Sequence, residues 1–260
     1  MGEDSGASTY ILGTEERRRL ELLEQCLDPM TTRSLDVIGV EAGWRCLELG
    51  GGGGSVTRML CDRVGPGGRV AAVDLDTRFL DEIDADNLDV LCQNVLTDGI
   101  PGDAYDLAHA RLLLMHLPTR EKFVGEMAAT LRPGGWLLVE DLDMCALPEL
   151  AEGIFADVVD KAIEAFDAAG ATAKFGRQLP ALFDTAGLED VEAICELMTF
   201  RGGSTEAQMF MASIAQLRPV LLAVGATENQ LDEFNQFVSD PVKWFSGFAI
   251  YSVRGRVPSV

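Results

Sequence analysis

The sequence contains no pair of cysteines in C-x-x-C spacing, although it holds six cysteines. They are scattered along the chain, at Cys26, Cys46, Cys61, Cys92, Cys145 and Cys195. Zinc sites and disulfide frameworks both need closer, patterned spacing, so neither is expected and no metal site is predicted. We expect free, buried thiols in a reducing compartment instead.

Basic residues are scarce. The chain has 21 lysines and arginines against 42 aspartates and glutamates, which gives a net charge of −21 at pH 7. This charge repels phosphate backbones and anionic membrane surfaces, so we expect no nucleic-acid partner and no membrane partner. Solubility alone accounts for the acidity, and selection for a cationic substrate is the other interpretation.

Long apolar runs are also missing, since no stretch approaches the length of a membrane span. The N-terminus, MGEDSGAST, lacks the apolar core of a signal peptide, so a cytoplasmic protein is expected. The 260 residues are 47% hydrophobic and 24% charged, as in an ordinary globular protein. Without an internal repeat or a Pro/Ser-rich linker, one large domain is expected.

A helical cap is predicted over residues 1–40. Its first helix should begin near Thr14, which is a good N-cap residue, and end at Asp28-Pro29. This helix is marked by apolar residues at helical spacing, Leu20, Leu23 and Leu27. A second helix is expected over residues 31–40.

From Arg45 onwards, short apolar strands alternate with helices. The predicted strands are RCLELG, RVAAVDLD, LDVLCQN, YDLAHA and WLLVEDLD. Helices are expected over SVTRMLCDRV and over residues 120–132, with Pro133-Gly134-Gly135 ending the latter. Because the strands show little alternation between apolar and polar positions, they imply a parallel sheet that is covered on both faces.

The last third of the chain changes character. Helices are expected over residues 149–169 and over LPALFDTAGL, followed by a long strand, DVEAICELMTF. A helical insertion at about 204–240 then precedes a final strand, FSGFAIYSVRGRV. Two late strands separated by an insertion suit an antiparallel pair at the sheet edge. Residues 41–260 are therefore expected to form one α/β domain.

Five consecutive glycines lie between the first strand and its helix, in LELGGGGGSVTRML. Glycine loses the most backbone entropy on folding, so bare backbone here must serve a close approach. A loop at a helix N-terminus attracts a ligand's negative group. The dinucleotide fingerprint G-x-G-x-x-G/A does not fit, because Ser55, Val56 or Thr57 falls at its third position, and the phosphate loop fails because no lysine follows.

An acidic residue precedes alternating glycines instead, in Glu48-x-Gly50-x-Gly52-x-Gly54. This pattern resembles the first motif of class I S-adenosylmethionine (SAM)-dependent methyltransferases. The resemblance implies that Glu48 attracts the ammonium of the cofactor and that backbone N–H groups suit its carboxylate. It extends over about residues 45–194, through YDLAHARLLLMHLP, LRPGGWLLVED and LPALFDTAGLEDVEA. It implies a Rossmann-like seven-stranded sheet, mostly parallel with an antiparallel last strand, with helices on both faces and an N-terminal helical lid.

A nucleoside site is expected at the ends of the next two strands. Asp74 ends its strand 20 residues beyond Gly54, where an acid accepts hydrogen bonds from both ribose hydroxyls. Asp76 is the alternative, and Leu75 is included in the cofactor site. The resemblance places Asn94 and Val95 near the adenine, with Asn94 where the family usually has aspartate.

Two further residues complete the expected cofactor site. Tyr10 lies in YILGTEERRRLELLE, which resembles a lid helix seen in some members of the family. Its ring would lie over the sulfonium as a cation–π contact, or it is a surface tyrosine. Arg111, just past the fourth strand, either holds the cofactor carboxylate or a substrate oxygen, or forms a surface ion pair.

Histidines are scarce as well, which limits the candidates for a proton acceptor. His109 lies within a predicted strand and is expected to be packed in the core. His116 lies near the expected substrate entrance, where a pKa near neutrality suits a base; a helix-end residue bound to a carbonyl is the alternative. Asp141, preferred to Glu140, is expected to bind the substrate or orient the base.

An apolar set from the insertion and the last strand either walls a substrate pocket or belongs to the core. Its members are Met209, Met211, Trp244, Phe245 and Phe248. Core packing is the preferred interpretation for most of them.

The predicted function is methyl transfer from SAM to a small-molecule acceptor, in the manner of secondary-metabolite enzymes. This in-line displacement needs no covalent nucleophile. One alternative is a SAM-binding protein of the same fold that transfers no methyl group, as a cyclase or a regulatory module. A nicotinamide-dependent oxidoreductase is disfavoured by the failed dinucleotide spacing. The expected partner is a small molecule, with a homodimer as a further possibility.

Overall fold

The computed structural model describes residues 14–102, 104–144 and 153–259. Its strands form one seven-stranded sheet in the order β3-β2-β1-β4-β5-β7-β6, in which β7 runs antiparallel to both neighbours. The strands are β1 (Arg45–Leu49), β2 (Arg69–Asp74), β3 (Leu88–Cys92), β4 (Tyr105–Arg111), β5 (Leu131–Asp143), β6 (Glu189–Arg201) and β7 (Trp244–Arg256). The predicted fold class, a mostly parallel seven-stranded sheet with an antiparallel last strand, is confirmed.

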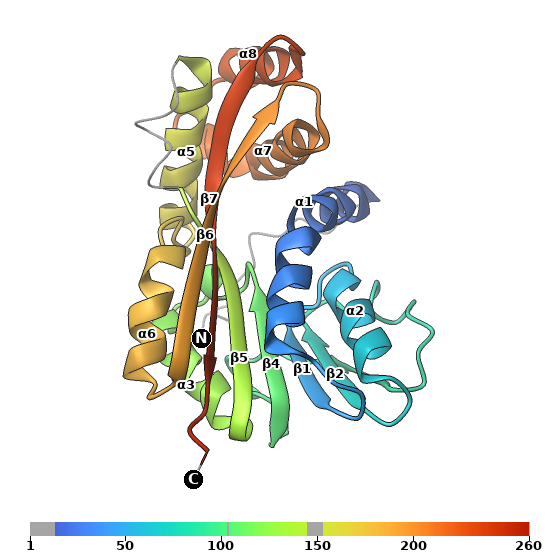
Figure 1. Cartoon of the computed structure of the whole chain (residues 1–260). Helices are drawn as coiled ribbons and strands as arrows, with labels where there is room; N and C mark the ends of the chain where they lie inside the picture. Colours follow the sequence, from blue (N-terminus) through green and yellow to red (C-terminus); the bar gives the residue numbers. More distant parts are fainter. Residues whose placement is uncertain (1–13, 103, 145–152, 260) are drawn as a thin grey trace, which may run out of the picture.

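Helices cover both faces of the sheet (Figure 1). α1 and α2 pack on one face, and α3 and α6 pack on the other. The helices are α1 (Thr14–Ile38), α2 (Ser55–Val64), α3 (Arg120–Ala129), α5 (Ile154–Ala168), α6 (Leu179–Thr185), α7 (Thr205–Ala223) and α8 (Glu228–Ser239), with 3-10 turns η1 (Leu114–His116) and η2 (Gly176–Gln178). Four of the five β1 residues are buried, which explains why the central strands read as apolar runs.

α1 is one continuous helix, so the prediction of two helices divided at Asp28-Pro29 is wrong. Pro29 lies inside α1, where a proline removes one backbone hydrogen bond. Figure 1 shows α1 changing direction along its length, as helices do at an internal proline. Side chains on both sides of Pro29, among them Asp28 and Thr31, bond to the body of the protein and stabilise the helix across it.

β5 begins at Leu131, five residues before the predicted start at Trp136. The Pro133-Gly134-Gly135 segment does not separate helix from strand but forms an irregular part of the strand, opposite a register shift between Tyr105 and Leu107 of β4. Gly135 is required there because a Cβ atom would lie 2.8 Å from the Tyr105 carbonyl oxygen.

The predicted helical insertion consists of α7 and α8, which pack with α5 beyond the carboxyl ends of the central strands (Figure 1). Phe155 of α5 stacks between Phe234 of α8 and Phe245 of β7, with ring centroids 5.7 and 5.4 Å apart. Met209, Phe245 and Phe248 are buried in this cluster and belong to the core. Trp244 is 64% exposed and does not wall a pocket.

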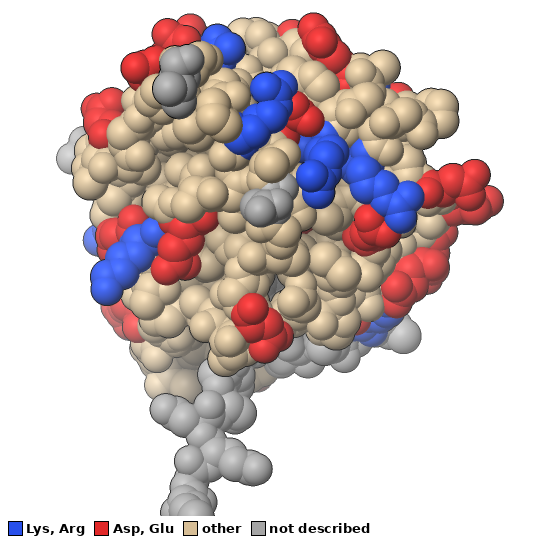
Figure 2. Space-filling view, turned by 90° about the horizontal axis from the view of Figure 1, so that it is seen from below, with Lys and Arg blue, Asp and Glu red and all other residues tan. Residues whose placement is uncertain are grey.

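Charged side chains of both signs lie side by side on the face seen from below (Figure 2). Arg69 pairs with Asp89 at 2.5 Å, and Arg132 pairs with Asp106. The expectation of no nucleic-acid partner is not tested by these pairs and stays a prediction. None of the helices in the described ranges combines the length and the apolarity that crossing a bilayer requires.

The cysteines depart in part from the prediction of buried thiols. Cys46 and Cys61 are buried and free, as expected. Cys92 and Cys195 are free but exposed, and they lie on the two edge strands, β3 and β6. Cys145 lies outside the described residues.

Candidate functional site

The candidate site lies at the carboxyl edge of the sheet, where β1, β2, β3 and β4 all end. The glycine loop follows β1, Asp74 ends β2, Gln93 and Asn94 follow β3, and Arg111 ends β4. The topology therefore brings together most of the residues that the sequence singled out. Tyr10 lies outside the described residues, and its contact with the cofactor stays a prediction.

The glycine loop adopts backbone conformations that favour glycine at three alternating positions. Gly50, Gly52 and Gly54 have φ values of 73°, 54° and 87°. Most of its N–H groups already have partners within the protein, which differs from the predicted donors for a ligand carboxylate. Gly50 and Gly51 donate to the Val73 carbonyl oxygen, at 2.8 and 3.3 Å, and Gly54 donates to the Gly51 carbonyl oxygen at 2.9 Å.

Side chains of the protein itself approach this loop closely. A Cβ atom at Gly53 would lie 2.3 Å from Glu24 Oε1, and one at Gly51 would lie 2.9 Å from the Leu80 side chain. Glu24 belongs to α1 and accepts a hydrogen bond from the Ser55 backbone N–H, at 3.2 Å, at the start of α2. Part of the requirement for bare backbone therefore comes from the docking of α1 on the loop.

Asp74 is hydrogen-bonded to the glycine loop. Its Oδ2 atom accepts from the Gly52 N–H at 2.9 Å, and its Oδ1 atom accepts from the Asp76 N–H at 3.1 Å. Burial raises the pKa of this carboxyl, against these backbone hydrogen bonds, which lower it. Asp76 instead forms an ion pair with Arg78 at 2.7 Å. The geometry thus favours Asp74 over Asp76 as the acid that faces the site.

Three residues near Asp74 concern the expected adenine site. Leu75 is 57% exposed, an uncommon state for a leucine directly after a central strand. Asn94 uses its side-chain oxygen to accept from the Leu96 N–H at 3.0 Å, so this oxygen caps a turn. Val95, the next residue, is half-buried.

Gln93, the residue after β3, was not predicted from the sequence. Its Oε1 atom is buried and accepts no hydrogen bond from the described residues. Its backbone N–H donates to the Asp74 carbonyl oxygen at 3.0 Å, which fixes the residue beside the end of β2. A buried acceptor without a partner is costly unless a ligand satisfies it. The only available sequence signal was an amide residue directly after an apolar strand.

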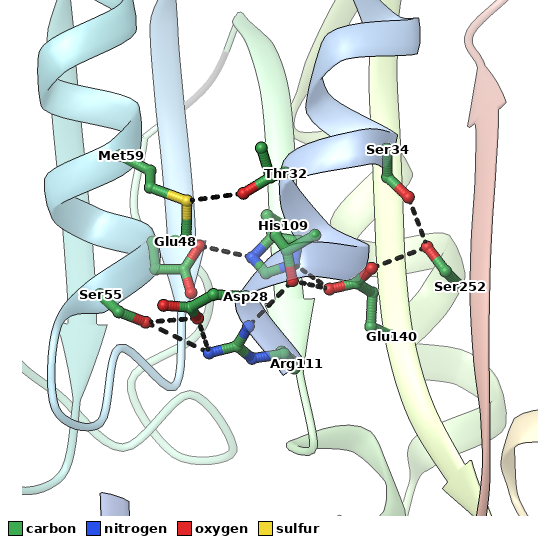
Figure 3. Close-up of polar contacts among 11 residues, drawn as sticks. Asp28, Thr32, Ser34, Glu48, Ser55, Met59, His109, Arg111, Glu140 and Ser252 are labelled. Atoms are coloured by element: carbon green, nitrogen blue, oxygen red, sulfur yellow. Dashed lines mark hydrogen bonds and ion pairs between the residues drawn. The ribbon is translucent and has the colours of Figure 1, made fainter. Parts of the chain in front are cut away.

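Glu48 is not directed at open solvent, because its carboxylate lies inside the protein against His109 (Figure 3). Its Oε2 atom is 2.6 Å from His109 Nδ1, and both side chains are buried. Burial raises the pKa of Glu48, and the His109 charge opposes that shift. Because Glu48 is only 2% exposed, its carboxylate offers little surface to a ligand's ammonium in this arrangement. The prediction that His109 is a hydrogen-bonded core residue is confirmed.

Glu140 completes a buried chain of polar groups across the sheet. Its Oε2 atom lies 3.5 Å from His109 Nε2, and its Oε1 atom accepts from Ser252 Oγ at 2.7 Å. Thr31 of α1 also donates to Glu140, and Ser34 of α1 lies 2.8 Å from Ser252 (Oγ to Oγ). Burial alone would raise the pKa of Glu140, but the hydrogen bonds and positive charges around it outweigh burial, so the pKa is lowered overall. The chain of polar groups therefore fastens α1 to the sheet.

Arg111 forms an ion pair, but a largely buried one rather than a surface pair. Its guanidinium lies 2.9 Å from Asp28 Oδ1 and donates to Thr31 Oγ1 at 2.9 Å and to Ser55 Oγ at 3.3 Å. Ser55 Oγ in turn donates to Asp28 at 2.8 Å. Arg111 thus links the end of β4, the middle of α1 and the first residue of α2 (Figure 3).

His116 lies on η1, with its ring centroid 6.0 Å from that of Phe166. The expected pKa near neutrality is wrong. Burial, together with the charges of Arg19 and Arg120, lowers the pKa of His116 to about 4. The imidazole is therefore neutral at physiological pH.

Asp141 is fully buried and holds the turn that carries His116. Its Oδ2 atom accepts from the Met115 N–H at 3.0 Å, and its Oδ1 atom accepts from the Leu142 N–H at 2.9 Å. Burial raises the pKa of Asp141 to about 7, against these bonds. Of its two predicted roles, orienting the base fits this geometry, because the carboxylate is engaged with the backbone of η1. Among the described residues, no group of three or more histidine, cysteine or acidic side chains is placed to hold a metal ion.

The chain is similar in sequence to known methyltransferases. Residues 47–139 match a family model described as a methyltransferase domain. The ubiquinone/menaquinone biosynthesis C-methyltransferase UbiE of Hahella chejuensis is 30% identical over 114 residues, which cover 41% of this chain and 46% of that protein. The methyltransferase GfsG of Streptomyces halstedii is 27% identical over 186 residues, which cover 66% of this chain and 63% of that protein. The chain thus matches less than two thirds of the length of either relative.

Solved structures share the fold at low sequence identity. The YcgJ protein of Bacillus subtilis has a TM-score of 0.58 at 16% identity, covering 88% of this chain and 98% of that chain. Phosphoethanolamine N-methyltransferase 2 of Haemonchus contortus, in complex with S-adenosylhomocysteine, has a TM-score of 0.52 at 18% identity, covering 93% of this chain and 52% of that chain. The [4+2]-cyclase SpnF has a TM-score of 0.54 at 18% identity, covering 88% of this chain and 81% of that chain.

Proposed function

Because the chain belongs to the class I SAM-dependent methyltransferases, we propose that it transfers the methyl group of SAM to a small-molecule acceptor. The observation that carries the proposal is the link between the glycine loop and Asp74, at the carboxyl edge of the sheet. A loop without side chains beside a fixed carboxylate suits a nucleoside joined to an amino acid. A natural-product acceptor and a cytoplasmic location are finer parts of this proposal, and they rest on the resemblance of the sequence.

The described residues fit the cofactor in three respects. The Asp74 carboxylate keeps lone pairs for the ribose hydroxyls after accepting two backbone hydrogen bonds. Leu75 offers exposed apolar surface to the adenine ring, and Gln93 Oε1 offers a buried acceptor to its exocyclic amine. With most of its N–H groups engaged, the loop from Gly50 to Gly54 contributes close approach rather than free donors.

The chemistry needs positioning more than reactive groups. When bound, SAM supplies an electrophilic methyl group on a positively charged sulfur. The chain must then hold the acceptor in line and exclude water, and α5 and α7 lie over the carboxyl edge where they can do so. We assign proton acceptance to the neutral imidazole of His116, which is a weak base because its pKa is lowered to about 4, with Asp141 as the residue that positions it.

Calorimetry with S-adenosylhomocysteine and with NAD tests the cofactor assignment. We expect binding of the former, and a loss of about 100-fold in affinity for Asp74→Asn, because two charge-assisted hydrogen bonds are weakened. Asp76→Asn is the matched control and should bind nearly as tightly as the wild type. Binding of NAD alone would refute the proposal.

A non-transferring protein of the same fold is the second candidate. It is favoured by the similarity of the fold to that of the [4+2]-cyclase SpnF. Incubation with methyl-labelled SAM and fractionated small-molecule extracts separates the two candidates. Label in a small product supports transfer. Tight binding of SAM with no labelled product from any fraction supports the second candidate.

A further inference from the structure

β6 is an unusually long and open edge strand. It has 13 residues, lies last in the sheet order and, within the described part of the chain, pairs with β7 alone (Figure 1). Ten of its residues are exposed, including every residue from Glu192 to Leu197. Such an edge presents a row of N–H and C=O groups that can pair with another strand.

The exposed side chains of β6 are apolar on one face. Ala193, Cys195 and Leu197 alternate with residues on the face toward α1, where Glu196 pairs with Arg33. Leu197 is 41% exposed, and the charged residues of this run, Glu192 and Glu196, lie on the other face, where they pair with Arg254 and Arg33. Natural edge strands are usually protected by charges or proline at such places.

The opposite face of β6 continues onto α1. Ile194 pairs with Ser252 of β7, which bonds to Ser34 of α1, and Ile194 is 41% exposed. Val37, one turn after Ser34 on the same side of α1, is 63% exposed. Ile194 and Val37 are therefore exposed apolar side chains on the α1 face, which also carries the ion pair between Arg33 and Glu196.

We propose that β6 pairs antiparallel with β6 of a second copy of this chain, about a two-fold axis through Cys195. In this register Ala193 lies opposite the partner's Leu197, small against large, Cys195 lies opposite its own copy, and Ile194 lies opposite the partner's Glu196. The N-terminal end of the strand, with Glu189 and Glu192, then approaches the basic end of the partner strand.

Charge selects this register over its neighbours. Register bulges in the β6–β7 pairing at both ends leave residues 192–197 as the regular run, so the axis must lie near its middle. Shifting the axis to Ile194 would set Glu192 against the partner's Glu196. Shifting it to Glu196 would set that carboxylate against its own copy. Like charges directly opposite each other destabilise a strand pair, and the axis at Cys195 avoids both arrangements.

Sedimentation over a concentration series, at physiological ionic strength, tests the proposal on the full-length protein. We expect a species of twice the 28.1 kDa chain mass for the wild type. Ala193→Lys should shift the protein to the monomer mass, because the new charge faces the partner's Leu197, while circular dichroism stays unchanged. Ala129→Lys, the same change at the exposed end of α3, should leave the dimer intact.

Thiol cross-linking locates the axis. Opposed Cα atoms in an antiparallel pair lie about 4.5–5.5 Å apart, so a short bismaleimide should join two Cys195 side chains. Cys195→Ser should abolish the cross-linked dimer, and Cys92→Ser, which removes the exposed thiol on the other edge strand, should not. A wild-type monomer at all concentrations, or a dimer that survives Ala193→Lys, would overturn the proposal.

Discussion

His109 Nδ1 lies 2.6 Å from Glu48 Oε2, and neither side chain is exposed to solvent. The pair joins β1 to β4 beneath α1, directly before the glycine loop and Arg111. Glu48 is the acidic residue of the motif from which the function was predicted. In the folded protein its immediate partner is a histidine. Glu48 therefore helps to hold β1 against β4 and, with β1, the start of the glycine loop.

The stability of this pair depends on pH. Burial alone would lower the pKa of His109, but the charges of Glu48 and Glu140 raise it from 6.5 to about 9. A raised histidine pKa contributes stability that is complete below pH 6.5 and is lost as the pH rises through about 9. The free energy of unfolding should therefore fall by about 3 kcal/mol over this range because of His109.

Urea titrations at a series of pH values check this expectation. His109→Gln should be less stable at pH 6.5 and should lose the alkaline slope. His116→Gln is the control, because the pKa of His116 lies near 4 and adds no slope between pH 6.5 and 9. An unchanged slope in His109→Gln would contradict the assignment.

Thr31 is predicted to fasten α1 to the sheet. Its hydroxyl donates to Glu140 and accepts from Arg111 at 2.9 Å, so Thr31→Val leaves two buried charged groups each without one partner. We expect a loss of about 1–3 kcal/mol in unfolding free energy. Thr32→Val, on the next residue, removes only a bond to the Met59 sulfur at 3.4 Å and should cost less than about 0.5 kcal/mol.

α1 and the last strands show which parts of the fold can be predicted from the sequence. The sequence pattern predicted β6, the helical insertion and β7 to within a few residues. It failed at Pro29, because polar contacts from distant strands stabilise the helix there, and those contacts have no local signal. Tertiary context overrode the local preference for a break.

The candidate site shows the same division. Motif spacing predicted that the glycine loop, Asp74 and the end of β3 lie at one edge of the sheet, because the carboxyl ends of parallel strands meet there. It did not reveal that Glu48 faces His109 or that Asn94 caps a turn, because both follow from side-chain directions. Gln93 became apparent only through a buried oxygen that has no hydrogen-bond partner in the described ranges.

Gln93→Leu should weaken cofactor binding without harming the fold. The change removes a buried acceptor that has no partner among the described residues, so the melting temperature should stay the same or rise. The Kd for S-adenosylhomocysteine should increase about 10-fold if Gln93 accepts from the adenine amine. Asn94→Ala is the comparison. Because the Asn94 oxygen accepts a hydrogen bond from Leu96, the Asn94→Ala variant should have a lower melting temperature and a nearly unchanged Kd.

Asp141→Asn should disturb η1 and catalysis together. An asparagine cannot accept both the Met115 and Leu142 N–H bonds with separate oxygens, so about 1–3 kcal/mol of stability should be lost and His116 should shift. We expect kcat/KM to fall at least 10-fold. Asp143→Asn, two residues on, breaks an ion pair with Arg177 and should lower the melting temperature with little effect on kcat.

His116 provides the sharpest test of the proposed proton transfer. Because its pKa lies near 4, it is already neutral at pH 6, and kcat/KM should show no histidine inflection between pH 6 and 8. His116→Gln should lower kcat by about 100-fold while KM for SAM changes little, since a general base acts mainly in the transition state. A change in kcat/KM with a midpoint near pH 6.5 in the wild type would show that another group or the solvent takes the proton. A His116→Gln variant with full kcat would show the same. Phe166→Leu is the matched control: it keeps the histidine but alters the ring beside it, and should change kcat by only a few-fold.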